Sequence, residues 1–241
     1  MVCTSCCNDN DDSSNLADSI LVKKVLVTSG DKVIEQKIIY DGYKIVSIIW
    51  NGGFRENFTY TGNLITKIED VDSSGAVLGG TEYNYNNGKI YSSLSYKFFF
   101  VHEYLSLVKF VHNEDGTVSY QHYKVNSRTG EEEGKDSFSG KYFFKDGNRI
   151  KGESYHNSVF ERSTSYEYDT KYNNFKNVLG YNLLLGYMPS INNVVRSKSI
   201  QKSGIVSEQV NFYVYNRQGY PTKKIVGVVD GVPFSVVKYG Y

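Results

Sequence analysis

The chain has 241 residues, of which 40% are hydrophobic, so it is long enough to bury a substantial core in one large all-β domain or two small ones. Its 27 Lys and Arg residues balance 26 Asp and Glu residues, and no basic cluster stands out, which argues against a nucleic-acid partner. No stretch approaches the roughly 18 to 20 consecutive apolar residues of a membrane-spanning helix. The longest apolar run, at 98–101, is broken by His102 and Glu103 and predicts a buried strand.

All three cysteines lie in the first seven residues, and the polar acidic tract 8–14 follows them. Cys3-Thr4-Ser5-Cys6 resembles the end of a bacterial lipoprotein signal, and the tract is similar to the acidic export signal of surface lipoproteins in the Bacteroidota. The resemblance implies that a lipid is attached to Cys6, with Cys7 as the second choice. It also implies that this lipid anchors the protein to the membrane, at the bacterial outer membrane or the cell surface.

A secretory signal needs a basic start and an apolar core of about 7 to 15 residues. Only Met1-Val2 precede Cys3, so we expect either that the natural start lies further upstream or that the chain is shortened. Two other interpretations of the cysteines stay open. A soft-metal or thiol–disulfide site is disfavoured because there is no second Cys pair, and the nearest His is His102. The other is a disordered N-terminus with incidental cysteines.

We assign residues 1–20 to a flexible acidic leader and 21–241 to a single β domain. The body has 22 Tyr, 13 Phe and 22 Gly against 3 Pro, a composition typical of strands joined by tight turns. Asn-Gly and Asp-Gly pairs supply the positive φ angles that hairpins require. They occur at 41–42, 51–52, 87–88, 115–116, 146–147 and 230–231. The pattern predicts an antiparallel meander.

The strand segments form a degenerate repeat of an aromatic residue, any residue, an aromatic residue, a short turn with Gly, and then Ile or Leu. Its copies lie at 40–48, 58–68, 83–94, 142–150 and 213–225. They are roughly 20 to 25 residues apart where they are densest, so each copy is expected to be one hairpin. Hairpins that bury each other's aromatic faces predict a curled sheet or a partly open β-barrel.

The repeat resembles YD or Rhs-type repeats, which contain Tyr-x-Tyr-Asp-x-x-Gly patterns. Residues 166–178 are similar to a segment of uncharacterised Bacteroidota lipoproteins, although Asn173-Asn174-Phe175 stands where those proteins often have Asn-Pro-Phe. The similarity continues through an apolar stretch at 178–185, Asn192-Asn193 and 219–222. It covers roughly residues 20–241. It implies a porin-like antiparallel β fold in a lipoprotein of unknown function, with no active site to carry over.

Residues 174–188 break the strand rhythm. Phe175, Val178, Leu179 and Leu183 are near helical spacing, which predicts a short helix or an ordered loop. Because the segment is apolar, we expect it to plug one end or face of the sheet, in preference to contacting a ligand.

Catalytic and metal-binding motifs are not found in the sequence. There is no G-x-S-x-G elbow, and the four histidines, His102, His112, His122 and His156, lack metal-ligand spacing. The ten-residue interval from His102 to His122 leaves a weak metal site open, but ordinary strand-surface positions are favoured. Glu131–Glu133 predicts a solvated hairpin tip. We therefore assign no catalytic residue, no metal and no cofactor.

Trp50 lies beside Asn51-Gly52-Gly53 and is the candidate platform for a sugar ring, although cross-strand packing is the favoured role of the aromatic residues. The sequence as a whole predicts a cell-envelope binding or interaction module, not an enzyme, with a protein partner or an envelope glycan as ligand. Two alternatives remain. A glycan-degrading enzyme would bring two carboxylates within about 5 to 10 Å in a barrel, and a structural assembly subunit would expose an apolar patch or a strand edge.

Overall fold

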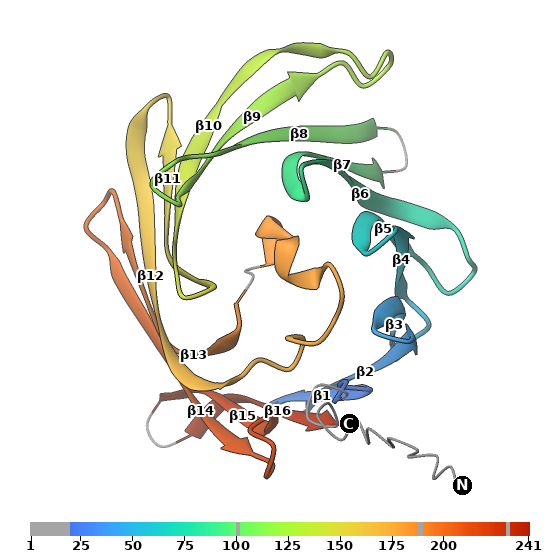
Figure 1. The fold of residues 1–241 in the computed structure, drawn as a ribbon, viewed down its shortest axis with the longest axis vertical. Coiled ribbons are helices and arrows are strands. Elements are labelled where there is room, and N and C mark those ends of the chain that lie inside the picture. The colour runs from blue at the N-terminus through green and yellow to red at the C-terminus, as the bar shows by residue number, and fades with distance from the viewer. Residues whose placement is uncertain (1–19, 100–101, 188–189, 230–231) are drawn as a thin grey trace, which may run out of the picture.

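The computed structural model describes residues 20–99, 102–187, 190–229 and 232–241. They form one closed antiparallel barrel in which each strand pairs with the next along the chain and β1 pairs with β16 (Figure 1). The strands are β1 Lys24–Ser29, β2 Lys32–Asp41, β3 Lys44–Trp50, β4 Arg55–Thr61, β5 Leu64–Val71, β6 Val77–Asn86, β7 Lys89–Phe99, β8 His102–His112, β9 Val118–Val125, β10 Glu132–Lys145, β11 Asn148–His156, β12 Val159–Tyr172, β13 Asn192–Gln201, β14 Val206–Tyr215, β15 Pro221–Val229 and β16 Val232–Gly240.

The predicted meander is confirmed, and the sheet closes completely. The closing register runs from Lys24 opposite Gly240 to Thr28 opposite Val236. Both residues of the Asn87-Gly88 turn have positive φ, at 49° and 74°, as a tight hairpin turn requires. No helix in the described part of the chain is long and apolar enough to cross a bilayer.

The aromatic repeat of the sequence corresponds to a bulged hairpin. Tyr40 pairs with Ile45, Tyr60 with Ile65 and Tyr85 with Ile90, and each pairing follows a register shift. The shift turns the tyrosine and the isoleucine toward the barrel interior. Successive hairpins are then joined by the phenol groups, because Tyr60 Oη accepts a hydrogen bond from Ile45 N at 3.1 Å and Tyr85 Oη donates one to Ile65 O at 2.7 Å.

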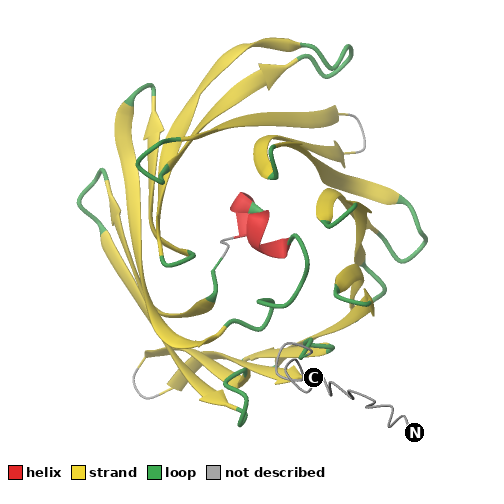
Figure 2. Ribbon diagram, in the orientation of Figure 1, coloured by secondary structure: helices red, strands yellow, loops and turns green. Residues whose placement is uncertain are grey.

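The segment predicted to be a short helix or an ordered loop is an ordered loop inside the barrel. We call residues 173–187 the plug. It contains the 3₁₀ turns η2 Tyr181–Leu183 and η3 Leu185–Tyr187 and lies within the ring of strands (Figure 2). Leu179 N donates to Tyr43 O at 3.0 Å, which ties the plug to the β2–β3 hairpin.

The core lies between the plug and β1–β7. Leu184 and Val178 of the plug are buried in one cluster with the inward isoleucines and valines of these strands. The buried members from the barrel wall are Val25, Ile38, Ile45, Ile48, Phe58, Ile65, Ile68, Tyr83 and Ile90, with Val22 just before β1.

The outer wall carries ion pairs around its circumference. Lys24 pairs with Glu35 at 2.9 Å on β1 and β2, and Lys67 with Glu69 at 2.7 Å on β5. The pairs Lys109–Glu132, Lys151–Glu153 and Arg196–Glu208 continue the series on β8 to β14. Charged side chains therefore alternate with the inward-facing residues on most of the strands.

Candidate functional site in the barrel lumen

The plug packs against one side of the barrel and leaves three adjoining cavities in front of the other. The first, the aromatic cavity of about 260 Å³, lies between the plug and β6–β10. It is lined by Thr81, Tyr83, Ile90, Ser93, Ser95, Val108, Phe110, Tyr120, His122, Tyr142, Leu185, Gly186 and Tyr187.

The second, the arginine cavity of about 200 Å³, shares Tyr120, Tyr142 and Gly186 with the aromatic cavity and adds Arg149, Arg162 and Tyr166. The third, the rim cavity of about 660 Å³, shares Ser154 and Arg162 with the arginine cavity and is also lined by Phe138, Tyr155, Glu161, Gln201, Lys202 and Ser203. The shared lining residues place the three cavities in one row from the rim into the lumen.

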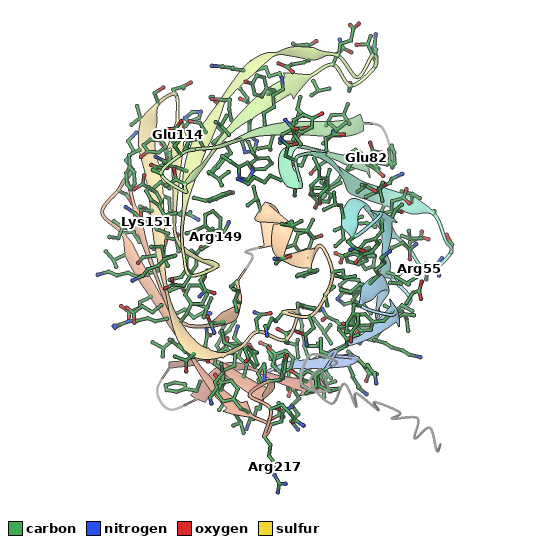
Figure 3. The ribbon with its side chains drawn as sticks, viewed as in Figure 1. Arg55, Glu82, Glu114, Arg149, Lys151 and Arg217 are labelled. Atoms are coloured by element: carbon green, nitrogen blue, oxygen red, sulfur yellow. The ribbon has the colours of Figure 1, made fainter. Side chains whose placement is uncertain are left out.

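Arg149 is the most unusual residue of this row. It lies on β11 and is 6% exposed, and Figure 3 shows it inside the ring, with Lys151 of the same strand on the outside. Its Nη1 donates to Leu185 O of the plug at 3.1 Å, and its guanidinium lies 4.6 Å from the ring centre of Tyr142 and 5.9 Å from that of Tyr166. Within the described part of the chain, its buried Nε has no hydrogen-bond partner.

Among the described residues, no carboxylate forms an ion pair with Arg149. The other guanidinium of the row belongs to Arg162, which is exposed. The carboxyl group of Glu153, whose residue also lines the arginine cavity, accepts from Lys151 Nζ at 2.6 Å and from Tyr155 Oη at 2.8 Å. This carboxyl group belongs to the outer-wall ion pairs, and it is the Glu153 carbonyl that accepts from Tyr120 Oη at 3.3 Å. The charged side chains of the arginine cavity are therefore those of Arg149 and Arg162.

Arg149 occupies a position that isoleucine holds in other hairpins. A register shift between Phe143 and Phe144 pairs Phe144 with Arg149, and Tyr168 Oη of the next hairpin donates to Arg149 O at 2.7 Å, as Tyr85 Oη does to Ile65 O. The repeat copy at 142–150 ends on Ile150, but the residue that pairs at the register shift, as Ile45, Ile65 and Ile90 do, is Arg149. The signal that could have found the site is a charged residue at this position of the repeat.

Glycine at two inward positions makes room for the aromatic lining. Gly140 lies beneath the Tyr120 ring, where an added Cβ would clash with the Tyr120 phenol, and Gly152 contacts the Tyr142 ring. The two rings are stacked with their centres 4.8 Å apart. Burial raises the pKa of Tyr120 and of Tyr142, so both phenols stay neutral hydrogen-bond donors.

The histidines do not form a metal site in the described residues. His112 pairs with Val118 and bonds Ile90 O, whereas His122 pairs with Val108, so the register separates them along the strands. The side chain of His102 lies outside the described residues. His122 faces the aromatic cavity, where burial lowers its pKa, and it packs edge-on against Phe138. His156 lies against the same Phe138 ring.

A carboxylate pair missed by the sequence analysis lies near the plug. Glu56 on β4 is the cross-strand partner of Asp70 on β5. Burial, and then the neighbouring Asp70, raise the pKa of Glu56 to about 7, and burial raises that of Asp70. Neither residue lines any of the three cavities. Pairing across strands depends on register, which the sequence does not specify. The cluster Glu131–Glu133 is exposed at the β9–β10 hairpin, as predicted.

Trp50 lies at the end of β3, partly buried, and packs against the core on the side of the plug. Its ring meets that of Phe54 edge-on at 5.1 Å. It does not line the row of cavities, so its role as a sugar platform stays a prediction. Cys6 and Cys7 lie outside the described residues.

No family model and no curated protein matches the chain. Solved structures do. A porin-like protein from Bacteroides vulgatus superposes with a TM-score of 0.62 at 16% identity, covering 92% of this chain and 98% of the other. A porin-like protein from Bacteroides uniformis gives 0.54 at 10% identity, covering 91% and 97%. At these identities the similarity concerns the fold, and the expected porin-like β fold is confirmed.

Proposed function

We propose that this protein is a cell-envelope binding module whose ligand, a glycan, lies in the row of cavities inside the barrel. The observation that carries the proposal is the continuity of the rim, arginine and aromatic cavities, with tyrosine rings and polar groups along their length. Binding sites of this kind combine aromatic surface with a few oriented polar groups.

The outer wall supports a barrel that works in water. A barrel embedded in a bilayer presents an outward apolar band about 25 Å tall. Here Lys24–Glu35, Lys67–Glu69 and the other ion pairs lie on outward positions of strands all around the ring. Attachment to the membrane would then come from the lipid that the N-terminal resemblance implies at Cys6. We favour binding over glycan hydrolysis because the carboxylate pair Glu56 and Asp70 lies away from the cavities.

The test is a binding screen with the full chain purified without detergent. An oligosaccharide array followed by calorimetry should give a saturable ligand at one site per chain. Gly186→Phe should abolish that binding, because Gly186 lines both inner cavities and an added Cβ meets no atom within 4 Å. Arg217→Phe, in the exposed β14–β15 turn, is the control. Binding that survives Gly186→Phe, or a chain that needs detergent to stay in solution, would contradict the proposal.

A second role, as a subunit of an envelope assembly, is favoured by an apolar patch on the outer wall. Phe212 and Val214 on β14 are 55% and 54% exposed, and Phe234 on β16 is 70% exposed. Contiguous exposed apolar side chains mark protein contacts. Sedimentation of the chain should show concentration-dependent association that Phe212→Glu removes. A monomer at all concentrations argues against self-association.

A further inference from the structure

We propose that the arginine cavity is a carboxylate subsite and that the ligand is an acidic saccharide. This deepens the proposed function, on which it rests, by naming the chemical class that the lumen selects. Arg149 would hold the carboxylate, and Arg162 would meet it at the boundary with the rim cavity.

Arg149 carries a charge that no neighbouring acidic group of the described residues compensates. A guanidinium that is 6% exposed has lost nearly all its contact with water. Burying a charge is unfavourable unless a counter-charge or several hydrogen bonds replace the solvent. In the described residues the side chain donates from Nη1 to Leu185 O and bonds the Tyr142 phenol, neither of which neutralises the charge, and Nε has no partner.

The hairpins elsewhere in the barrel carry an apolar residue at the position of Arg149. Ile45, Ile65 and Ile90 seal the equivalent positions of other hairpins. If Arg149 served only to hold the plug, a buried apolar residue there would pack the plug as it does elsewhere. A cation at the repeat position that faces the arginine cavity is what binding an anion requires.

Positively charged side chains line the cavities between the rim and Arg149. Arg162 lines both the arginine and the rim cavities, and Lys202 lines the rim. Glu161, which also lines the rim, lies 3.7 Å from Lys202, and Glu153 is occupied by Lys151 and Tyr155. The positive groups therefore lead from the rim to the buried Arg149, an arrangement that draws an anion inward.

The groups around Arg149 favour the carboxylate of a saccharide over other anions. The planar guanidinium fork suits a carboxylate, and the stacked pair Tyr120 and Tyr142 next to it offers an aromatic face. Hydroxyl groups of Ser154 and Thr164 line the same cavity and can bond sugar hydroxyls. The row of cavities continues on both sides, which leaves space for neighbouring sugar units.

Calorimetric titrations of the full chain with trigalacturonate, maltotriose and inorganic phosphate test the inference. Trigalacturonate should bind at least tenfold more tightly than maltotriose, and phosphate should not compete with it. Arg149→Gln should weaken trigalacturonate binding about 10- to 100-fold, the range of a charge-assisted hydrogen bond, and weaken maltotriose binding by a smaller factor. Arg162→Gln should weaken it about three- to tenfold, and Arg217→Gln, in an exposed turn, should not change it.

The outcomes separate the two proposals. Equal affinity for the two trisaccharides, or an Arg149→Gln variant that is folded by circular dichroism and binds normally, overturns the carboxylate subsite and leaves glycan binding standing. Phosphate binding that depends on Arg149 overturns it in favour of a phosphoryl ligand. If neither these trisaccharides nor the array gives binding, both proposals fail. Should Arg149→Gln not fold, unchanged binding by Arg162→Gln is the overturning result.

Discussion

The two sides of the barrel use the same hairpin for opposite purposes. In the β2–β3, β4–β5 and β6–β7 hairpins the inward position after the turn is isoleucine, and Leu184 and Val178 of the plug are buried in the same cluster. On β10–β12, that position is Arg149, flanked by the inward glycines Gly140 and Gly152, and cavities remain between wall and plug. The repeat therefore forms the scaffold, and residues that depart from the repeat form the site.

The largest effect is expected on the β2–β7 side of the barrel, where the plug packs against the wall. Leu184→Ala removes a fully buried plug side chain and should lower the free energy of unfolding by about 2 to 5 kcal/mol, since a cavity is left in the core. Ile205→Ala, at a position 58% exposed, is the matched control and should cost less than about 0.5 kcal/mol. Urea unfolding followed by circular dichroism measures both. Equal effects would mean that the plug does not pack as described.

On the β10–β12 side, Gly140→Ala should lower the free energy of unfolding by about 1 to 3 kcal/mol. The new methyl group collides with the Tyr120 phenol and with Glu153 O. Gly186→Ala meets no atom within 4 Å and is the control. The same urea titrations apply. If Gly140→Ala is neutral, the Tyr120 ring does not lie over the glycine, and the lining of the arginine cavity is arranged differently.

Glu56 on β4 should make the free energy of unfolding depend on pH. Its folded-state pKa of about 7 lies above its ordinary value of 4.5. The Glu56 carboxyl therefore binds more protons in the folded protein than in the unfolded chain between these values, so its contribution to stability is highest below pH 4.5 and is lost as the pH rises toward 7. We expect a loss of roughly 1 to 3 kcal/mol over this window.

The measurement is the thermal unfolding midpoint from pH 4 to pH 8. Glu56→Gln should flatten the profile and stabilise the protein at pH 8, because the amide is neutral throughout. Glu114→Gln, in the exposed β8–β9 turn, should keep the wild-type loss. A profile that Glu56→Gln leaves unchanged would show that this carboxyl is not the group responsible.

The smallest effect is expected on the outer wall, which does not differ between the two sides. Lys24→Gln breaks the ion pair with Glu35, whose side chains are 54% and 46% exposed, and should change the free energy of unfolding by less than about 1 kcal/mol. The change should shrink further in 0.5 M salt, since solvent ions screen exposed charges. A loss comparable to that of Leu184→Ala would mean that these charges are not in water.

The sequence by itself determined the meander, its tight turns and the position of the plug. The alternation of Tyr and Phe indicates the strands, and the Asn-Gly and Asp-Gly pairs indicate the turns between them. Both signals can be read from the sequence because side-chain period and φ preference are local properties. It also predicted a porin-like fold, and solved structures of that description share the fold.

Only the tertiary structure decided that the barrel closes and what faces its interior. Closure depends on β1 meeting β16, more than 200 residues away along the chain. The inward position of Arg149 depends on a one-residue register shift, which moves a side chain to the other face of the sheet. The sequence did not predict the site at Arg149, because register is set by pairing between strands and not by the residues of one strand.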